Sequence, residues 1–575
     1  MATGVTDAAG RPGERAGQAD ADGRGAPGGR GPGGGGLARR VLVGGGWTVA
    51  VIAAFAVYFR LASTRAVNSD GASQALQGWD MLHGNLLLRG WTTSDVSFFT
   101  TEVPQYALVE LVHGLSQGVV HIAAAMTYTL VLLFAALLAK GTATGREAAA
   151  RIAIGVGIML APQLASGTNE LLSSPDHIGT TVPLLLILLV IDRVQRPRWW
   201  VPVLVGVLLA WADLADSVVL LAAVIPLIVV CAFRVAQSRQ RWAARWYEIA
   251  LAGAAVAGFA VAQVAYRIIH ALGGYTTRPL GIQLAPLSEI FGHNLPIAAE
   301  GLLLLPGADF LGLPAGSSTL FVALHLAGVA AAAAPIALAL WRFRRRDADF
   351  VNQLLVAGIV VNFVGYVVTT HVYNVASARE MAPALPFAAV LAGRELGPFF
   401  AARRARDRRV GGPRHGADAP RYRPVWVAVL AVVLAGYLAG LGLELTTPTA
   451  PPQAAQLTAW LESHPIGTGL SGYWAANVVA LTSGGRAAVR SVAVTDGRVV
   501  STPNNMKAVW FDPAESRVDF VVLFPGVPAD LGVPAYPGFT DRQAVLATFG
   551  KPSRTYHVGQ YTILWWPKNL LPDMG

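Results

Sequence analysis

The chain contains 575 residues, of which 54% are hydrophobic and only 14% are charged. Soluble domains carry about 25% charged residues, so a chain this long and this apolar cannot bury its apolar surface in one or two soluble cores. The composition therefore predicts a protein that crosses a membrane several times. The single cysteine, Cys231, excludes an internal disulfide and argues against a structural zinc site.

Residues 1–40 are rich in Gly, Arg, Ala and Pro and contain few large apolar side chains. Such a segment buries too little surface to offset the entropy lost on ordering it, and it lacks the apolar stretch of a signal peptide. We expect a disordered tail on the cytoplasmic side.

Apolar runs that could cross about 30 Å of hydrocarbon follow one another between residues 41 and 446. The run at 199–213 is short, and the run at 380–396 contains Pro383 and Pro386. The eleven expected membrane spans are 41–62, 118–139, 150–166, 177–194, 199–213, 217–234, 247–268, 317–341, 350–370, 380–396 and 424–446. The sequence therefore predicts a polytopic α-helical membrane protein.

The charges of the connecting loops indicate the orientation. If the tail is cytoplasmic, the cytoplasmic connections hold most of the Lys and Arg residues, including nine arginines between residues 394 and 423. The outer loops hold only six arginines: Arg60, Arg65, Arg89, Arg267, Arg278 and Arg379. This is the positive-inside pattern, so the net charge of +10 reflects membrane topology and nucleic acid is not an expected partner.

An odd number of spans places residues 447–575 outside the cytoplasm. This region is more polar and begins with a Pro- and Thr-rich hinge at 446–452. Residues 453–463 and 473–481 are predicted to be helices, whereas 518–524 and 561–566 are rich in β-branched and aromatic residues, which favour strands. We expect a small α/β domain.

The first outer loop, 63–117, is predicted to contain two short helices. Ala72, Leu76, Trp79, Leu82 and Leu86 recur every three or four residues, as on one apolar face of a helix. A helix of this kind, with a polar opposite face, is expected to lie in the plane of the membrane interface. A second helix is predicted to start near residue 102, because a proline at 104 is typical of a first helical turn.

Acidic residues recur where the chain meets the outer membrane boundary. Asp70, Asp95 and Glu102 lie in the first outer loop. An acid at a membrane boundary is costly unless it faces water or a partner, so each is a candidate functional residue. Further outer-face acids are Glu170, Asp176, Asp213 and Asp216.

Most of these acids also have a structural interpretation, and Asp213 and Asp216 could simply form a tight turn. Asp70 could cap the interface helix, and Glu102 could complement the dipole of the second helix. Asp95 could be a loop residue, and Asp176 could cap the span that starts at His177. His177 could bind phosphate or only a neighbouring acid.

The order of these features resembles the GT-C superfamily of membrane glycosyltransferases. One span is followed by Ser69-Asp70-Gly71, by an interface helix, and by Thr101-Glu102-Val103-Pro104. The segment 376–386 is similar to the Arg-Tyr-x-x-Pro-type segment that opens a late span in this superfamily, although Glu380 and Met381 stand where an aromatic residue is commoner. The superfamily includes protein O-mannosyltransferases, aminoarabinose transferases of lipid A, and arabinosyl- and mannosyltransferases of actinobacteria. The resemblance covers residues 41–446, and the Ala-, Gly- and Arg-rich composition suggests an actinobacterial source.

The resemblance implies an inverting transfer of a hexosyl or pentosyl unit from a polyprenyl-phosphate donor, whose tail lies among membrane lipids. The acceptor would be a hydroxyl on an extracytoplasmic glycan, lipid or protein of the cell envelope. Asp70 matches the first-loop acid of the superfamily and is expected to be the general base. Glu102 is expected to orient the acceptor or to help hold a divalent cation such as Mg²⁺ or Mn²⁺.

The same resemblance implies a binding site for the donor phosphate. Arginine binds phosphate oxygens bidentately, so Arg379 is the first candidate, with His177 and Arg278 beside it. The outer loop 268–316, which contains Arg278, could cover this site as a lid or could be a passive interface segment.

Asp95, Tyr473 and Trp474 are the candidate ligands of the sugar or the acceptor. Tyr473 and Trp474 could instead dock the outer domain on the membrane body or fill its core. We expect Asp70, Glu102 and Arg379 to converge on one outward-facing cavity.

Two other classes of function stay open at this point. A sugar or lipid transporter or flippase often shows inverted repeats and broken helices at the membrane midplane, whereas here the acids gather at the outer face. A non-catalytic membrane scaffold for envelope assembly is the second alternative. We find no P-loop, dinucleotide fingerprint or nucleophile elbow in the sequence.

Overall fold

The computed structural model describes residues 34–162, 166–194, 196–238, 245–279, 281–311, 316–345, 348–401, 423–464, 466–528 and 535–574. The chain forms two units, Met1–Ala50 and Val51–Gly575, and every contact reported below lies within the second. The predicted disordered tail lies largely outside the described residues, and helix α1 (Gly34–Ala62) begins within its predicted range.

Each of the eleven predicted spans contains a helix. They are α1, α4 (Gln117–Lys140), α5 (Gly145–Met159), α7 (Thr181–Arg193), α8 (Trp200–Asp213), the continuous pair η1 (Leu220–Val224) and α9 (Ile225–Gln237), α10 (Trp246–Ala271), the pair α13 (Ser317–Leu324) and α14 (Leu326–Arg342), α15 (Phe350–Val367), α16 (Ala384–Ala401) and α17 (Arg423–Glu444). Among the described residues, seven helices are long and apolar enough to cross a membrane alone, and α8 is apolar but shorter. The prediction of a polytopic α-helical membrane protein is confirmed.

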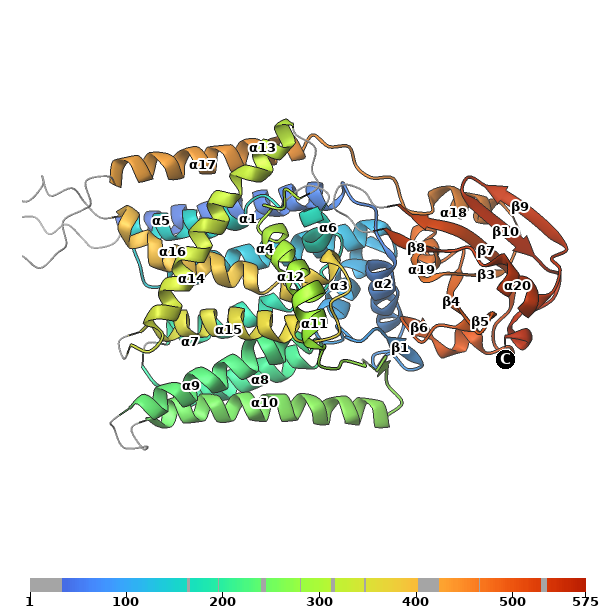
Figure 1. Ribbon diagram of the computed structural model, residues 1–575, viewed down its shortest axis with the longest axis horizontal. Helices are drawn as coiled ribbons and strands as arrows, with labels where there is room; N and C mark the ends of the chain where they lie inside the picture. Colours follow the sequence, from blue (N-terminus) through green and yellow to red (C-terminus); the bar gives the residue numbers. More distant parts are fainter. Residues whose placement is uncertain are drawn as a thin grey trace, which may run out of the picture. The chain divides into compact units, whose positions relative to one another are not determined.

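The long helices pack around a continuous apolar core. Tyr128 of α4, Leu185 of α7, Leu355 of α15 and Phe387 of α16 are all buried in it. Several of these helices run side by side in Figure 1. Because α4, α5, α7, α15 and α16 contact one another, the connections at their ends are held close together.

The connections form a layer of short elements. They are α2 (Ser69–Leu82), β1 (Trp91–Thr93), α3 (Glu102–His113), α6 (Ser166–Leu172), β2 (Thr276–Thr277), α11 (Leu287–Glu289), η3 (Ile290–Asn294), α12 (Leu295–Leu304) and the 3-10 helix η4 (Val375–Met381). Helix α2 packs against α3 on one side and against α19 (Tyr473–Thr482) of the C-terminal region on the other (Figure 1).

Helix α2 buries much of its polar face against protein and leaves part of the predicted apolar stripe exposed. Ser73, Gln74 and Gln77 are buried, whereas the predicted apolar positions Leu82 and Leu86 are 39% and 69% exposed. The polar face is buried because α19 and the loop before α7 supply it with hydrogen-bond partners, among them Asn477 and Asp176. The exposed leucines remain available for the membrane interface.

The C-terminal region is the predicted α/β domain. Its sheet has the strand order β5-β4-β3-β7-β10-β9, with β8 paired to β7. Strand β3 runs parallel to β4 and β7, and the other pairs are antiparallel. The strands are β3 (Thr468–Ser471), β4 (Val489–Thr495), β5 (Arg498–Ser501), β7 (Val518–Val527), β8 (Tyr536–Phe539), β9 (Arg554–Val558) and β10 (Tyr561–Trp565), and the helices are α18 (Ala455–Ser463), α19 and α20 (Arg542–Phe549).

A second, three-stranded sheet joins distant parts of the chain. Strand β1 of the first outer loop pairs with β2 of the second loop and with β6 (Met506–Lys507) of the C-terminal domain. The backbone N–H of Arg278 also donates to the carbonyls of Thr93 and Ser94, at 3.3 and 3.2 Å. These bonds anchor the start of the 268–316 loop, which was predicted to be either a lid or a passive segment.

Helix α3 lies outside the membrane-spanning helices and buries a row of titratable side chains. Glu102, Tyr106 and Glu110 are spaced by four residues, so they share one helical face, and all are at most 2% exposed. Helix α2 approaches α3 closely at Gly78, where an added Cβ would lie 2.9 Å from the backbone nitrogen of Ala107. Burial raises the pKa of the Glu102 carboxyl to about 8 and that of Glu110 to about 9, so both are protonated at neutral pH.

This burial predicts a loss of stability at alkaline pH. The unfolded chain releases the Glu110 proton near its ordinary pKa of 4.5, whereas the folded protein retains it up to about pH 9. The contribution to stability is therefore complete below pH 4.5 and is lost as the pH rises toward 9. We expect Glu110→Gln to flatten the fall in melting temperature between about pH 6 and about pH 9, as measured in detergent. Glu515→Gln, at an exposed position, serves as the control, and an unchanged slope in Glu110→Gln would contradict the prediction.

Candidate functional site

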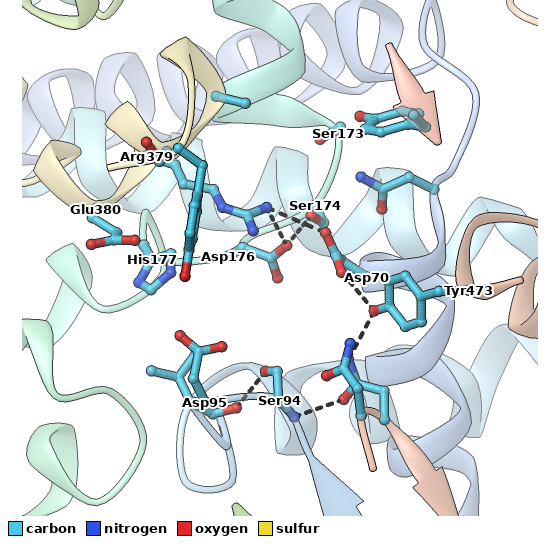
Figure 2. Close-up of a pocket in the computed structure, with 18 of the residues that line it drawn as sticks. Asp70, Ser94, Asp95, Ser173, Ser174, Asp176, His177, Arg379, Glu380 and Tyr473 are labelled. Carbon is cyan, nitrogen blue, oxygen red and sulfur yellow. Dashed lines mark hydrogen bonds and ion pairs between the residues drawn. The ribbon is translucent and has the colours of Figure 1, made fainter. Parts of the chain in front are cut away.

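One polar cavity of about 450 Å³ opens between the loops 63–117 and 268–316, the connection before α7, η4 and the C-terminal domain (Figure 2). Seven of the eight predicted site residues line it: Asp70, Asp95, His177, Arg278, Arg379, Tyr473 and Trp474. They come from segments separated by up to about four hundred residues in the sequence. The packing of the helical body and the docking of the C-terminal domain therefore assemble the cavity.

Asp70 lies in the first turn of α2 and does not cap it. The cap is Asn68, whose Oδ1 accepts a hydrogen bond from the backbone N–H of Gly71 at 3.1 Å. The Asp70 carboxylate is instead held by two side chains from elsewhere. Arg379 donates to Oδ2 at 3.3 Å and the Tyr473 hydroxyl donates to Oδ1 at 2.6 Å.

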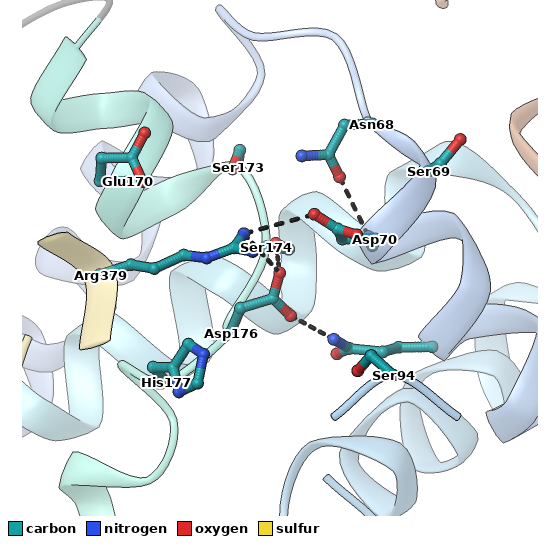
Figure 3. Close-up of polar contacts among 12 residues, drawn as sticks. Asn68, Ser69, Asp70, Ser94, Glu170, Ser173, Ser174, Asp176, His177 and Arg379 are labelled. Atoms are coloured by element: carbon teal, nitrogen blue, oxygen red, sulfur yellow. Dashed lines mark hydrogen bonds and ion pairs between the residues drawn. The ribbon is translucent and has the colours of Figure 1, made fainter. Parts of the chain in front are cut away.

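Arg379 projects from η4 toward two carboxylates (Figure 3). Its Nη1 lies 3.3 Å from Asp70 Oδ2 and 3.7 Å from Asp176 Oδ2. Burial lowers the pKa of the guanidinium, but the charges of Asp70 and Asp176 outweigh it and raise the pKa overall. Both ion pairs use Nη1, and Nε and Nη2 have no partner among the described residues.

Asp176 is part of this cluster and does not cap α7, which begins at Thr181. Its carboxylate accepts hydrogen bonds from Ser174 Oγ at 2.7 Å and from Gln74 Nε2. Burial, together with the nearby charge of Asp70, raises the pKa of Asp176. Glu170, in α6, also lines the cavity, and burial raises its pKa to about 7.

His177 adopts a left-handed backbone conformation, with φ of 56°, which is uncommon for a residue other than glycine. Its Nδ1 lies 2.9 Å from Asp216 Oδ2, and the same oxygen accepts from Thr180 Oγ1 at 2.7 Å. The ring lines the cavity, and Nε2 has no partner among the described residues. The surrounding bonds therefore hold the imidazole in place with one nitrogen unpaired.

Asp95 belongs to a second charged cluster in the cavity wall. His371 Nε2 lies 3.6 Å from Asp95 Oδ2 and 3.1 Å from Glu380 Oε1. These two carboxylates raise the pKa of His371 to about 10. Burial acts to raise the pKa of Asp95, but the hydrogen bond from His371 and nearby positive charge lower it overall. His371 is thus a cation that neutralises its two acidic partners in part.

Arg278 differs from the other cations of the cavity because no carboxylate pairs with its guanidinium in the described part of the chain. The residue is exposed, and its backbone is fixed by the bonds to Thr93 and Ser94. Arg278 therefore presents an uncompensated positive charge at the cavity.

The C-terminal domain contributes aromatic side chains to the cavity wall. Tyr473 and Trp474 begin α19, and the ring of Trp474 stacks on Tyr536 with centroids 4.1 Å apart and planes at 21°. Tyr536 and Asn505 also line the cavity. Sequence reasoning missed both residues, because neither belongs to a motif or a periodic pattern.

Glu102 does not line the cavity, in contrast to the prediction. Its carboxyl accepts a hydrogen bond from Thr101 Oγ1 and packs beneath Gly179, where an added Cβ would collide with Oε1 and Cδ of Glu102. The side chain is 1% exposed. The helical pattern of α3 directs it against Gly179 in the connection before α7, away from the cavity.

A resident divalent cation does not fit these residues. The part of the chain that the structure describes contains no group of three or more His, Cys, Asp or Glu side chains placed to hold a metal ion. Asp70 and Asp176 share Arg379, and Asp95 and Glu380 share His371, so four of the five acids that line the described cavity already have cationic partners. We derive no step through a metal.

No protein-family model matches the chain, and no curated protein matches it. Among solved structures, ArnT from Cupriavidus metallidurans bound to undecaprenyl phosphate is similar, with 15% identity and a TM-score of 0.52, over 90% of this chain and 98% of that chain. The oligosaccharyltransferase of Archaeoglobus fulgidus in the apo form aligns with 14% identity and a TM-score of 0.47, over 83% of this chain and 69% of that chain. The first likeness shows a shared fold, which agrees with the fold implied by the sequence resemblance; the second has too low a TM-score to add to it.

Proposed function

We propose that this protein transfers a hexosyl or pentosyl unit from a polyprenyl-phosphate donor to an acceptor hydroxyl at the outer face of the cytoplasmic membrane. The observation that carries the proposal is the convergence of Asp70, Arg379 and Arg278 on one polar cavity beside the membrane-spanning helices. The shared fold with ArnT, whose structure contains undecaprenyl phosphate, supports a lipid-linked donor.

In the proposed reaction Asp70 is the general base. Its carboxylate takes the proton of the acceptor hydroxyl while the hydroxyl oxygen attacks the anomeric carbon, a contribution of about 10²–10⁴-fold. The bond between the anomeric carbon and the phosphate oxygen breaks, and polyprenyl phosphate leaves with the bonding electrons. Attack opposite to the leaving group inverts the anomeric centre. Phosphate is a good leaving group, so the pair of acids that glycosidases use is not required.

The cations of the cavity suit the phosphate of the donor. Arg278 has no carboxylate partner in the described structure, and Arg379 retains Nε and Nη2 for an additional anion. His177 adds an unpaired ring nitrogen. Arginine binds phosphate oxygens through parallel N–H bonds, and charge on the departing phosphate would strengthen these bonds in the transition state.

The lipid tail of the donor has an apolar path at the cavity mouth. Residues beyond Gly281, which lines the cavity, carry exposed apolar side chains: Ile282 is 46%, Leu284 80% and Leu287 72% exposed. Exposed apolar side chains in a row are expected to face lipid in a membrane protein. The donor phosphate would then lie at Arg278, where this row meets the polar cavity.

The transferred sugar and the acceptor would contact other side chains of the cavity wall. Tyr473 and Trp474 present aromatic surface, and Asp95 presents a carboxylate that can accept hydrogen bonds from sugar hydroxyls. The acceptor belongs to an extracytoplasmic glycan, lipid or protein. The N-terminus would be cytoplasmic and the C-terminal domain extracytoplasmic, as the loop charges indicate.

Asp70→Asn is expected to abolish transfer while the protein still folds and binds lipid phosphate. The amide cannot accept the hydroxyl proton, so transfer of labelled sugar from a panel of undecaprenyl-phosphate hexoses and pentoses into isolated envelope should fall at least about 100-fold. Binding of undecaprenyl phosphate, measured by native mass spectrometry, should be retained. A flippase would still move lipid and a scaffold would be indifferent to the change, so retained transfer would refute the proposal.

Glu102→Gln is the matched comparison. Glu102 is protonated at neutral pH and lies outside the cavity, so an amide of the same shape should leave transfer within about 3-fold of wild type. A loss as large as that of Asp70→Asn would restore Glu102 as a catalytic residue and contradict the assignment made here.

Arg278→Ala is expected to weaken binding of the donor. Loss of the uncompensated cation should raise the donor KM about 10-fold or more. Arg278→Lys should restore the donor KM only in part, because an ammonium keeps the charge but cannot bind phosphate bidentately. Arg267→Ala removes an exposed arginine of α10 that does not line the cavity, and it should behave as wild type. Equal donor KM values in the two alanine variants would exclude Arg278 from phosphate binding.

A further inference from the structure

Helix α19 of the C-terminal domain reaches the first turn of α2 through Tyr473. The Tyr473 hydroxyl donates to Asp70 Oδ1 at 2.6 Å, and Ser69 Oγ donates to the backbone carbonyl of Tyr473 at 2.5 Å. The proposed general base is therefore in direct contact with a domain that lies outside the helical body (Figure 2).

Asn505 forms a hydrogen bond with the Tyr473 hydroxyl and is itself held by several further hydrogen bonds. Its Oδ1 accepts from the backbone N–H of Ser94 at 3.2 Å and from Gln77 Nε2 at 3.1 Å. Its Nδ2 donates to the Tyr473 oxygen at 2.9 Å, and its backbone carbonyl accepts from Asn477 Nδ2 at 3.1 Å. Asn505 is 5% exposed and has a left-handed φ of 48°, a conformation that asparagine tolerates better than most residues.

The direction of these bonds follows from donor and acceptor chemistry. A backbone N–H can only donate, so the end of Asn505 that faces Ser94 must be the amide oxygen. The other end, facing Tyr473, must then be the NH₂ group, and the phenol oxygen accepts from it. The phenol has one proton, and the carboxylate of Asp70 is the acceptor left for it. The backbone N–H of Ser94 thus fixes the donor-to-acceptor direction of the series of hydrogen bonds that ends at Asp70.

We infer that the hydrogen-bond chain Ser94–Asn505–Tyr473 orients the Asp70 carboxylate, and that the C-terminal domain thereby completes the reaction site, with Tyr473 and Asn505 as positioning residues. The orientation stands on the geometry alone; its consequence for catalysis rests on the proposed function.

The orientation matters because a free carboxylate rotates easily about its last torsion. Arg379 holds Oδ2 and Tyr473 holds Oδ1, so the two contacts together fix the carboxylate plane. Without the Tyr473 proton only one oxygen is held. General-base catalysis requires the accepting lone pair to lie within hydrogen-bond reach of the incoming hydroxyl, and small misplacements are costly.

The test compares Tyr473→Phe with Tyr561→Phe. Tyr561 is a buried tyrosine of the same domain, in β10, and it does not line the cavity. Tyr473→Phe should lower kcat about 10-fold or more and change the donor KM less than about 3-fold, whereas Tyr561→Phe should leave both unchanged. Undecaprenyl phosphate binding and melting temperature should match wild type, so that the loss is one of positioning and not of folding.

Asn505→Asp tests the polarity of the chain. The carboxylate has the shape of the amide but no N–H, so it offers an acceptor to the Tyr473 proton and draws it away from Asp70. We expect a loss of kcat in the same direction as in Tyr473→Phe. Wild-type kcat in Asn505→Asp, with Tyr473→Phe impaired, would refute the relay through Asn505.

A readout that does not depend on activity separates this inference from the proposed function. Hydrogen–deuterium exchange in the peptide that contains Asp70 should rise in Tyr473→Phe and stay at the wild-type level in Tyr561→Phe. If Asp70→Asn retains transfer, the proposed function fails, and the exchange data alone decide the orientation. If Asp70→Asn is inactive but Tyr473→Phe shows wild-type kcat and exchange, the inference fails and the proposed function stands.

Discussion

The site depends on one arrangement of charge in the cavity wall, in which Arg379 lies between the carboxylates of Asp70 and Asp176 (Figure 3). Two carboxylates this close to each other repel, and the partial desolvation of each costs free energy. The guanidinium compensates for both. Removal of Arg379 would leave two neighbouring carboxylates without their shared cation. The three segments that carry these residues are thus held together by charge as well as by apolar packing.

That arrangement bears on how a cavity rich in acids would bind the phosphate of the proposed donor. Arg379 and His371 each lie between two carboxylates, so nearby negative charge within the protein largely compensates their positive charge. In the described cavity wall, Arg278 is a cation whose charge is not compensated by a paired carboxylate. The electrostatic attraction for an anion is therefore concentrated at Arg278, next to the exposed apolar row that starts at Ile282. An amphipathic ligand, with a phosphate at one end and a hydrocarbon tail beyond it, matches this juxtaposition better than a free polar sugar does.

The sequence was sufficient for the elements that depend on local patterns. Hydropathy located a helix in each of the eleven predicted spans, seven of them long and apolar enough to cross a membrane in the described part of the chain, and β-branched runs located β7 and β10. Asp70, Arg379 and Arg278 were predicted as charges near the expected membrane boundary, where an unused charge is costly, and all three line the cavity. Each of these patterns (an apolar run, a β-branched run or a charge at the end of an apolar run) is read from a short stretch of sequence. No knowledge of tertiary structure is needed to find it.

The sequence was insufficient where the partner of a side chain lies far away in the chain. The apolar stripe of α2 gave no indication that Gln74 and Gln77 are buried, because their partners Asp176 and Asn505 lie far away in the sequence. Glu102 has the local pattern of a boundary acid, yet the rotation of α3 points it into protein. Asn505 gives no signal at all, since its importance comes from bonds to residues about thirty and about four hundred positions away.

These distant partners also determine how the C-terminal domain is placed. A purely apolar interface tolerates sliding, whereas buried polar groups must find specific partners, and a partly satisfied network is costly. Ser73, Gln77 and Ser94 on the body side bind Asn477 and Asn505 on the domain side. A shift of the domain by one residue would break these bonds and would also withdraw Tyr473 from Asp70. The polar contacts that dock the domain and the contact that orients the proposed base belong to one network, so the site reaches its final geometry only when the domain is correctly docked.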